Sequence, residues 1–128
     1  MPNPASENRL ILVDTSVWID HLKKSNPLLC QFLAEDLVVV HPFVIGELAT
    51  GMIKNRSMLL GLLRNLPQSP VIKESEYYSF IEQYVLFGKG VGFVDIHILA
   101  SAIKHGLSLW SLDKRLNSAA TDLGVCYP

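Results

Sequence analysis

Three short apolar runs, separated by longer stretches with helical spacing, constrain the fold of this chain most. The runs span residues 9–13 (RLILV), 37–40 (LVVV) and 107–112 (LSLWSL). Continuous apolar runs of this length are typical of strands buried on both faces. Strands that alternate with helices favour a parallel sheet covered by helices on both sides. We therefore expect an α/β fold with a mostly parallel central sheet.

The stretches between these runs carry helix signals. Apolar residues recur three and four positions apart, and cap-type residues or a first-turn proline precede several of the segments. The chain shows no internal repeat and no linker, so we predict one domain at residues 9–128 and a disordered extension at residues 1–8. Helices are predicted at residues 17–23, 28–34, 43–53, 57–66, 74–87, 93–104 and 114–123, and further short strands at 70–72 and 124–127.

Composition limits the class of protein. The chain has 128 residues, of which 49% are hydrophobic and 18% charged, which is typical of one ordered globular domain. No apolar run reaches the roughly 18 residues of a membrane span, and the N-terminal segment does not resemble a secretory signal. We expect a cytoplasmic protein without a membrane segment.

The cysteines and the net charge narrow the expectation further. Cys30 and Cys126 are far apart in sequence, and we predict that both are buried free thiols, with no zinc site. The net charge of −1 counts against a broadly basic nucleic-acid binder. It is compatible with a nuclease whose acidic residues are concentrated in one pocket, because bound metal ions reverse the sign of the charge there.

Two aspartates follow predicted strands directly. Asp14 ends the first run, and Asp113 follows the run at 107–112. In open α/β sheets, ligands bind at the carboxyl ends of the strands, where both residues would lie. The alternative is that each aspartate only caps the next helix.

Two further acids lie within apolar helical segments. Asp95 falls in the first turn of a helix that is apolar nearly all round, so it needs a partner, a cation or a proton. Glu47 is the single acid of its helix, and its alternative is a solvated surface position. No lysine or arginine lies in any of the four motifs except after Asp113, so the acids would repel one another unless cations are present. Oxygen ligands of this kind suit Mg²⁺ or Mn²⁺.

Several other features carry a structural explanation. His97 follows Asp95 by two positions, which places it on a different helix face, so we expect it to be packed or at an interface rather than a metal ligand. Ser16 and His21 lack the context of a catalytic triad. The glycines at 88, 90 and 92 lack the spacing of a phosphate-binding loop and indicate a flexible loop, in which Lys89 could touch substrate.

The four acidic motifs together resemble those of PIN-domain nucleases, and the first is very similar to the opening of VapC-type toxins. The resemblance covers residues 10–127. One departure is His97, where relatives often carry alanine or another small residue. The motifs are VDTSVWID around Asp14, VIGEL around Glu47, GFVDIHILA around Asp95 and LWSLDKRL around Asp113.

The resemblance implies a three-layer α/β/α sandwich and endonucleolytic hydrolysis of structured RNA such as tRNA or rRNA. Asp14, Glu47, Asp95 and Asp113 would bind one or two Mg²⁺ or Mn²⁺ ions. Ser111, and the hydroxyls of the first motif, would support those ligands from a second layer; the first motif contributes Thr15 and Ser16. Relatives form homodimers, and a small VapB-type antitoxin inhibits them. The toxin contacts operator DNA only through this antitoxin.

The sequence does not decide which basic residues contact the RNA backbone, and it leaves three other functions to consider. Each basic candidate could equally be a solvated surface cation. A receiver domain would need an adjacent acid pair after the first strand, but Thr15 follows Asp14. A non-catalytic PIN-fold binding module would lack the metal, and a PIN nuclease of RNA processing would lack an antitoxin. The candidate backbone contacts are Lys23, Lys24, Lys54, Arg56 and Lys89.

Overall fold

Three parallel strands form the sheet of the computed structural model, which describes residues 9–127. The strands β1 (Ile11–Val13), β2 (Val38–Val39) and β3 (Ser108–Trp110) follow the order β2-β1-β3. In the central strand, Leu12 lies opposite Val39 on one side and Leu109 on the other. All three strands are buried. The predicted parallel sheet is confirmed, and the predicted extension at residues 1–8 lies outside the described residues.

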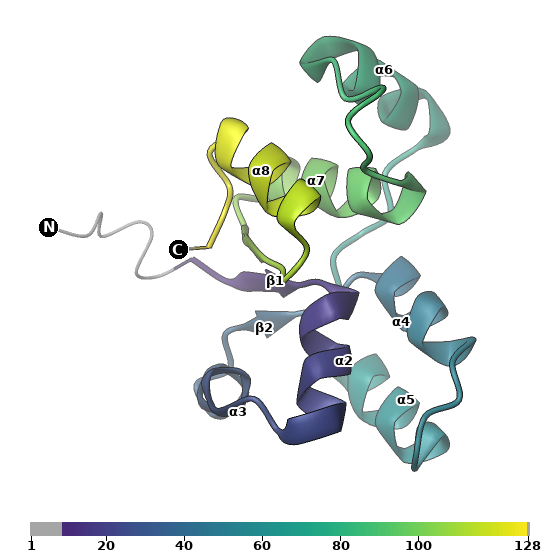
Figure 1. The fold of residues 1–128 in the computed structure, drawn as a ribbon, viewed down its shortest axis with the longest axis vertical. Coiled ribbons are helices and arrows are strands. Elements are labelled where there is room, and N and C mark those ends of the chain that lie inside the picture. Colours follow the sequence, from purple (N-terminus) through teal and green to yellow (C-terminus); the bar gives the residue numbers. More distant parts are fainter. Residues whose placement is uncertain (1–8, 128) are drawn as a thin grey trace, which may run out of the picture.

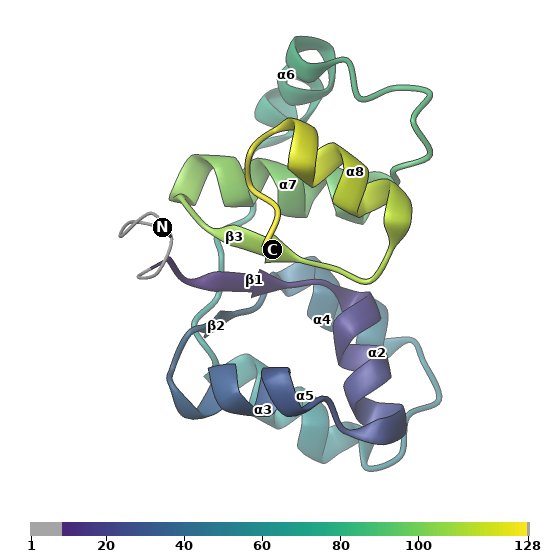
Figure 2. The same cartoon turned by 60° about the vertical axis from the view of Figure 1, so that its left-hand side comes forward.

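Helices cover the sheet from two sides. In Figures 1 and 2, α6, α7 and α8 gather on one side of the strands and α2 to α5 on the other. This is the α/β/α arrangement expected from the sequence. In the described part of the chain, no helix is long and apolar enough to cross a membrane. The helices are α2 (Thr15–Lys24), α3 (Pro27–Ala34), α4 (Pro42–Ala49), α5 (Arg56–Asn65), α6 (Glu74–Tyr84), α7 (Phe93–His105) and α8 (Lys114–Asp122).

Two helices end earlier than the apolar pattern predicts. Helix α4 was expected to reach residue 53, but it ends at Ala49, whose carbonyl accepts a hydrogen bond from Arg56 Nε at 2.8 Å. Helix α6 was expected to reach residue 87, but Val85 adopts a left-handed conformation with φ 52°. The Leu86 N–H then bonds to the Ile81 carbonyl at 3.0 Å. Local capping therefore overrides the apolar periodicity at both ends.

The two additional strands predicted at the edges are wrong as strands. Residues 70–72 are irregular, and the pairing with Val40 occurs earlier, as a single parallel bridge to Gln68. Pro67 and Pro70 flank this point, and proline has no N–H to extend a ladder. At the C-terminal end, only Cys126 forms a bridge, to Leu109.

Neither cysteine forms a disulfide. Both Cys30 and Cys126 are free thiols, as expected. The prediction that both are buried is wrong for Cys30, which is exposed, while Cys126 is half-buried. Helix α3 directs Leu29 and Phe32 into the core, and Cys30 lies on its outer face.

The parallel sheet brings the segments after β1 and β3 to one edge. The Asp14 N–H donates to the Trp110 carbonyl at 2.9 Å, so the two strands stay paired to their ends. Helix α7 packs beside them, with Ile98 and Leu99 fully buried. The core therefore fixes the positions from which the candidate site residues project.

Candidate active site

Asp14 lies at the junction between β1 and α2 and is only 5% exposed. Its Oδ2 atom accepts hydrogen bonds from the hydroxyls of Ser16 at 2.7 Å and Ser111 at 2.8 Å. Its Oδ1 atom accepts none from the residues that the structure describes. The carboxylate is therefore held through one oxygen, and the other oxygen is available to a ligand.

Ser16 and Ser111 connect the ends of the two neighbouring strands. Ser16 Oγ accepts the Leu112 N–H at 2.9 Å, and Ser111 Oγ accepts the Asp113 N–H at 2.9 Å. A serine hydroxyl has one hydrogen, and each of these hydroxyls donates it to Asp14. Both hydroxyls are thus oriented by the backbone, and together they orient the carboxylate of Asp14.

Asp113 precedes α8 as Asp14 precedes α2. Its Oδ1 atom accepts the Leu116 N–H at 3.0 Å, which caps the helix. Asp14 accepts the Ser16 N–H at the longer distance of 3.4 Å. Both aspartates are therefore helix caps, as the alternative interpretation predicted. Capping uses one carboxylate oxygen, so it does not prevent the other oxygen from binding a cation.

Glu47 reaches the same edge of the sheet from α4. Its Oε1 atom accepts a hydrogen bond from the Thr15 hydroxyl at 2.7 Å. Thr15 therefore contacts Glu47, whereas its neighbour Ser16 contacts Asp14. Glu47 is exposed, in agreement with the surface position that was its alternative interpretation, and yet it is tied to the residue beside Asp14.

Asp95 lies in the first turn of α7 and is half-buried. Burial raises the pKa of its carboxyl above the usual range, and the charges of Asp14, Asp113 and Glu47 raise it further. A hydrogen bond from the Gly92 N–H to Asp95 Oδ2, at 2.9 Å, acts in the opposite direction. Asp95 is thus within electrostatic reach of the other three acids, so the structure brings together residues from four separate segments.

The donor set suits a hard divalent cation. Within residues 9–127, the ion pairs join Lys24 to Asp20 and Lys104 to Glu76, and none involves the four acids. With the side chains in their present rotamers, no three His, Cys, Asp or Glu residues among the described residues are close enough together to coordinate one metal ion. Closure would depend on Glu47 and Asp113, which are exposed and can change rotamer rapidly. Uncompensated carboxylates, each held by one oxygen, fit Mg²⁺ or Mn²⁺.

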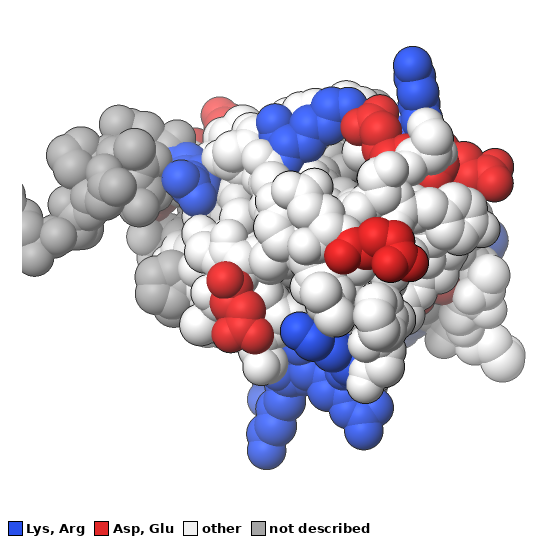
Figure 3. All heavy atoms as spheres, turned by 90° about the horizontal axis from the view of Figure 1, so that it is seen from above, with Lys and Arg blue, Asp and Glu red and all other residues white. Residues whose placement is uncertain are grey.

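The basic residues proposed as RNA contacts are all exposed, but two have partners. Lys24 lies 3.4 Å from Asp20, and Arg56 bonds to the end of α4. Lys23 and Lys54 line a shallow apolar pocket. On the face shown in Figure 3, basic and acidic side chains are interspersed, and no continuous basic area covers it.

His97 is packed, as its position two residues after Asp95 predicts. It is 4% exposed and stacks on Tyr77, with ring centroids 4.7 Å apart. Phe43 and Phe93 approach it at 4.7 and 4.6 Å. Burial lowers the pKa of the imidazole, which favours the neutral form. His21 accepts the Asn26 N–H and forms no hydrogen bond with Ser16 in the described residues, so no Ser–His pair forms.

Two functional details escaped the sequence interpretation. His41 is fully buried, its Nδ1 accepts the Phe43 N–H at 3.0 Å, and burial followed by the charge of His97 lowers its pKa to about 4. The local signal for this contact is the His41-Pro42 pair, in which a proline in the first turn follows the capping residue. The hydrogen bond from Gly92 to Asp95 was also missed, although it is a capping-box contact that a residue three positions into a helix can make.

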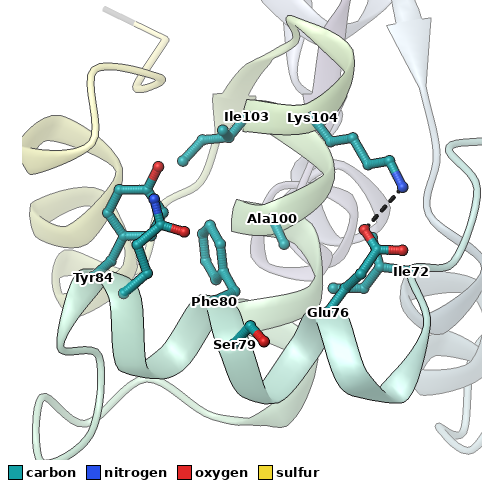
Figure 4. Close-up of a pocket in the computed structure, with 9 residues that line it drawn as sticks. Ile72, Glu76, Ser79, Phe80, Tyr84, Ala100, Ile103 and Lys104 are labelled. Carbon is teal, nitrogen blue, oxygen red and sulfur yellow. Dashed lines mark hydrogen bonds and ion pairs between the residues drawn. The ribbon is translucent and has the colours of Figure 1, made fainter.

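A separate cavity lies between α6 and α7 (Figure 4). Phe80 and Ala100 form part of its apolar lining, and Lys104 pairs with Glu76 at its rim at 2.9 Å. None of the four acids lines it. This cavity therefore does not belong to the acidic site.

Sequence comparison identifies the family. Residues 11–122 match the PIN domain. Ribonuclease VapC32 of Mycobacterium tuberculosis, in strains CDC 1551 and H37Rv, is 45% identical over 117 residues, which is 91% of this chain and 94% of that protein. The chain belongs to the PIN-domain family. Within that family, it is similar to the VapC-type ribonucleases.

A solved structure supports the fold. The crystal structure of PAE2754 from Pyrobaculum aerophilum superposes with a TM-score of 0.64 and covers 89% of this chain and 87% of that one. The two sequences are only 15% identical, so this likeness shows a shared fold and nothing about activity. The family resemblance and the α/β/α fold expected from the sequence are both confirmed.

Proposed function

We propose that this protein is a divalent-metal-dependent endoribonuclease that hydrolyses phosphodiester bonds in structured RNA. The observation that carries this proposal is the convergence of four carboxylates that no described cation neutralises, with the pKa of Asp95 raised by burial and by the other three acids. Similarity to VapC32, a ribonuclease, supports RNA as the substrate.

Asp14, Glu47, Asp95 and Asp113 would hold Mg²⁺ or Mn²⁺. Such an ion, when bound, polarises a phosphoryl oxygen and lowers the pKa of a water molecule. The protein itself supplies orientation: Ser16 and Ser111 direct Asp14, Thr15 directs Glu47, and the Gly92 N–H directs Asp95. These contacts act as a second layer around the ligands, which normally sets their geometry.

The biological role that we propose is that of a cytoplasmic, growth-inhibiting toxin. The name of VapC32 supports a VapB-type antitoxin as partner. We expect operator DNA to be contacted only through that antitoxin. Exposed apolar side chains in two places support one interface with the antitoxin and another in a homodimer. They are Ile19, Leu22 and Leu62 near α2 and α5, and Val71, Tyr78 and Phe93 near α6 and α7.

A cleavage assay tests the proposal. The purified protein is incubated with total tRNA and rRNA, in Mg²⁺, in Mn²⁺ and in EDTA, beside Asp95→Asn and a matched surface variant, Glu82→Gln on α6. We expect discrete fragments that need metal, disappear in Asp95→Asn and persist in Glu82→Gln. Cleavage that survives both EDTA and Asp95→Asn would contradict the proposed mechanism.

The cleavage assay, combined with thermal melting, growth and gene context, addresses two rival functions. An RNA-binding protein that neither cleaves RNA nor melts at a higher temperature with Mn²⁺ would be a non-catalytic PIN-fold module. A nuclease whose expression does not slow growth, and whose gene has no small antitoxin gene beside it, would belong to RNA processing.

A further inference from the structure

The glycine-rich loop before α7 is in close contact with α8. Gly90 has a φ of +75°, and a Cβ atom built on it would lie 2.7 Å from Arg115 Cδ and 2.9 Å from an Arg115 terminal nitrogen, Nη1. The arginine side chain therefore lies directly across the glycine. Any residue with a side chain at position 90 would have to push Arg115 aside.

This contact joins the segments that carry two of the acids. Gly92, two residues after Gly90, donates its N–H to Asp95 at 2.9 Å. Arg115 lies two residues after Asp113, which caps α8. Helices α7 and α8 lie side by side in both ribbon views (Figures 1 and 2). Arg115 is thus close to both segments that carry these acids.

Arg115 shares a surface cleft with a second cation. Lys89 lies in the glycine-rich loop before α7. Together with Arg115 and Ser118, it lines a cleft of about 370 Å³. Within the described residues, neither Lys89 nor Arg115 forms an ion pair or a side-chain hydrogen bond. Asp122 also lines the cleft without an ion pair to either cation. Two cations without an ion pair among the described residues therefore line one cleft, together with a single acid.

We propose that Arg115 and Lys89 bind backbone phosphates of the RNA beside the acidic site, a proposal that rests on the nuclease function proposed above. Metal ions held by the four acids would attract one phosphate within the pocket, but the chain as a whole carries a net charge of −1. Cations beside the pocket would therefore supply the attraction to the neighbouring phosphates. Arginine suits this role because its planar guanidinium can bind two phosphate oxygens, and lysine adds a point charge.

Gly90 has a defined part in this arrangement. Because it has no side chain, it leaves room for the Arg115 side chain to lie against the loop that carries Lys89. A Gly90→Ala variant keeps both positive charges, but it crowds Arg115 and strains the loop backbone at a positive φ, so both cations shift. It therefore separates the position of the charge from its mere presence.

RNA binding at several salt concentrations tests the proposal. The probe is a fluorescein-labelled single-stranded RNA of mixed sequence, and the parent is the Asp95→Asn variant of the whole chain, which we expect not to cleave the probe. We expect Arg115→Ala and Lys89→Ala each to raise Kd roughly 3- to 10-fold and to lower the salt slope by about 0.7. Arg115→Lys should fall between parent and Arg115→Ala, and Gly90→Ala should approach Arg115→Ala.

The matched control is Arg64→Ala. Arg64 is an exposed cation on α5, which lies on the other side of the sheet (Figure 2), so its loss should leave Kd and the salt slope unchanged. Thermal melts would check that each variant is folded. If Gly90→Ala does not fold, the comparison of Arg115→Lys with Arg115→Ala tests whether the geometry of the cation matters.

Two results separate this proposal from the nuclease proposal. Salt slopes of Arg115→Ala and Lys89→Ala equal to that of the parent, with normal metal-dependent cleavage by the wild type, would overturn the phosphate site alone. Arg115-dependent RNA binding by a wild-type protein that never cleaves RNA would overturn the nuclease function and support the phosphate site.

Discussion

Helix α7 carries two ionisable side chains two residues apart, and their surroundings differ. Asp95 faces three other acids, and burial and those charges raise its pKa. His97 faces Phe43, Tyr77 and Phe93, and burial lowers its pKa. Positions i and i+2 lie on different faces of a helix. One face therefore collects negative charge, and the other buries a neutral ring that serves packing.

The largest effect should come from Asp14, on the acidic face. Asp14→Asn keeps an oxygen that can accept from Ser16 and Ser111 but removes the negative charge. We expect a loss of RNA cleavage of more than about 100-fold, because losing an outer-layer partner of a metal ligand alone typically costs 10- to 100-fold. Initial rates at saturating Mg²⁺ measure it, and a loss below tenfold would show that Asp14 is not a ligand.

The hydroxyl that orients Asp14 should have the next largest effect. Ser111→Ala removes a donor to Asp14 and an acceptor of the Asp113 N–H, and we expect activity to fall about 10- to 100-fold. Ser101→Ala is the control. Ser101 is also buried, but its hydroxyl donates to the Pro70 carbonyl at 3.3 Å and not to any of the four acids. Equal activity in the two variants would show that the Ser111 hydroxyl is only structural.

Substitution of His97 tests the neutral face. His97→Ala should lower the free energy of unfolding by about 2–5 kcal/mol, because it leaves a cavity among the three rings. His97→Phe should cost less than about 1.5 kcal/mol, because the volume is similar and the unpartnered Nδ1 is removed. Urea unfolding of the two variants and the wild type would measure both changes. If His97→Phe abolished the Mn²⁺-induced rise in melting temperature, His97 would be a metal ligand after all.

His41 should give the smallest of these effects, a pH dependence of stability. Its pKa falls from 6.5 to about 4 in the folded state, so the unfolded chain takes up a proton first as the pH falls. The stabilising contribution is complete above pH 6.5 and is lost as the pH falls towards 4. The His41→Asn variant keeps an acceptor for the Phe43 N–H. From pH 7 to pH 5, its free energy of unfolding should fall by about 1–2 kcal/mol less than that of the wild type.

Urea unfolding of both proteins at pH 7 and pH 5 measures this difference. The comparison concerns the change with pH, so any constant cost of placing an asparagine at this buried position cancels. Parallel losses in the two proteins would assign the acid sensitivity to other groups.

Much of the acidic site could be predicted from the sequence because strand ends are recognisable. Asp14 and Asp113 follow apolar runs, and carboxyl ends of parallel strands meet at one edge of the sheet. Asp95 was recognisable because it is the single acid of an apolar helix. These inferences needed only local patterns and one rule of topology.

The remaining parts depend on contacts that no local pattern encodes. Thr15 bonds to Glu47, 32 positions away, and Gly90 lies against Arg115. The edge pairing of Val40 shifted to Gln68 because prolines interrupt the ladder, and the aromatic packing around His97 joins three helices. Side chains from distant segments meet only once the core is assembled, so their partners could not be predicted from spacing.

Thermal unfolding of the wild type and Asp95→Asn, each at neutral pH in EDTA and in Mn²⁺, tests the central claim most directly. The raised pKa of Asp95 means that its charged form disfavours the folded state above that pKa. In EDTA, Asp95→Asn should therefore melt higher than the wild type, by roughly 2–5 °C. In Mn²⁺ the wild type should gain stability and the variant should gain much less. A variant that melts lower in EDTA, with no response of either protein to Mn²⁺, would contradict a cation-dependent acidic site.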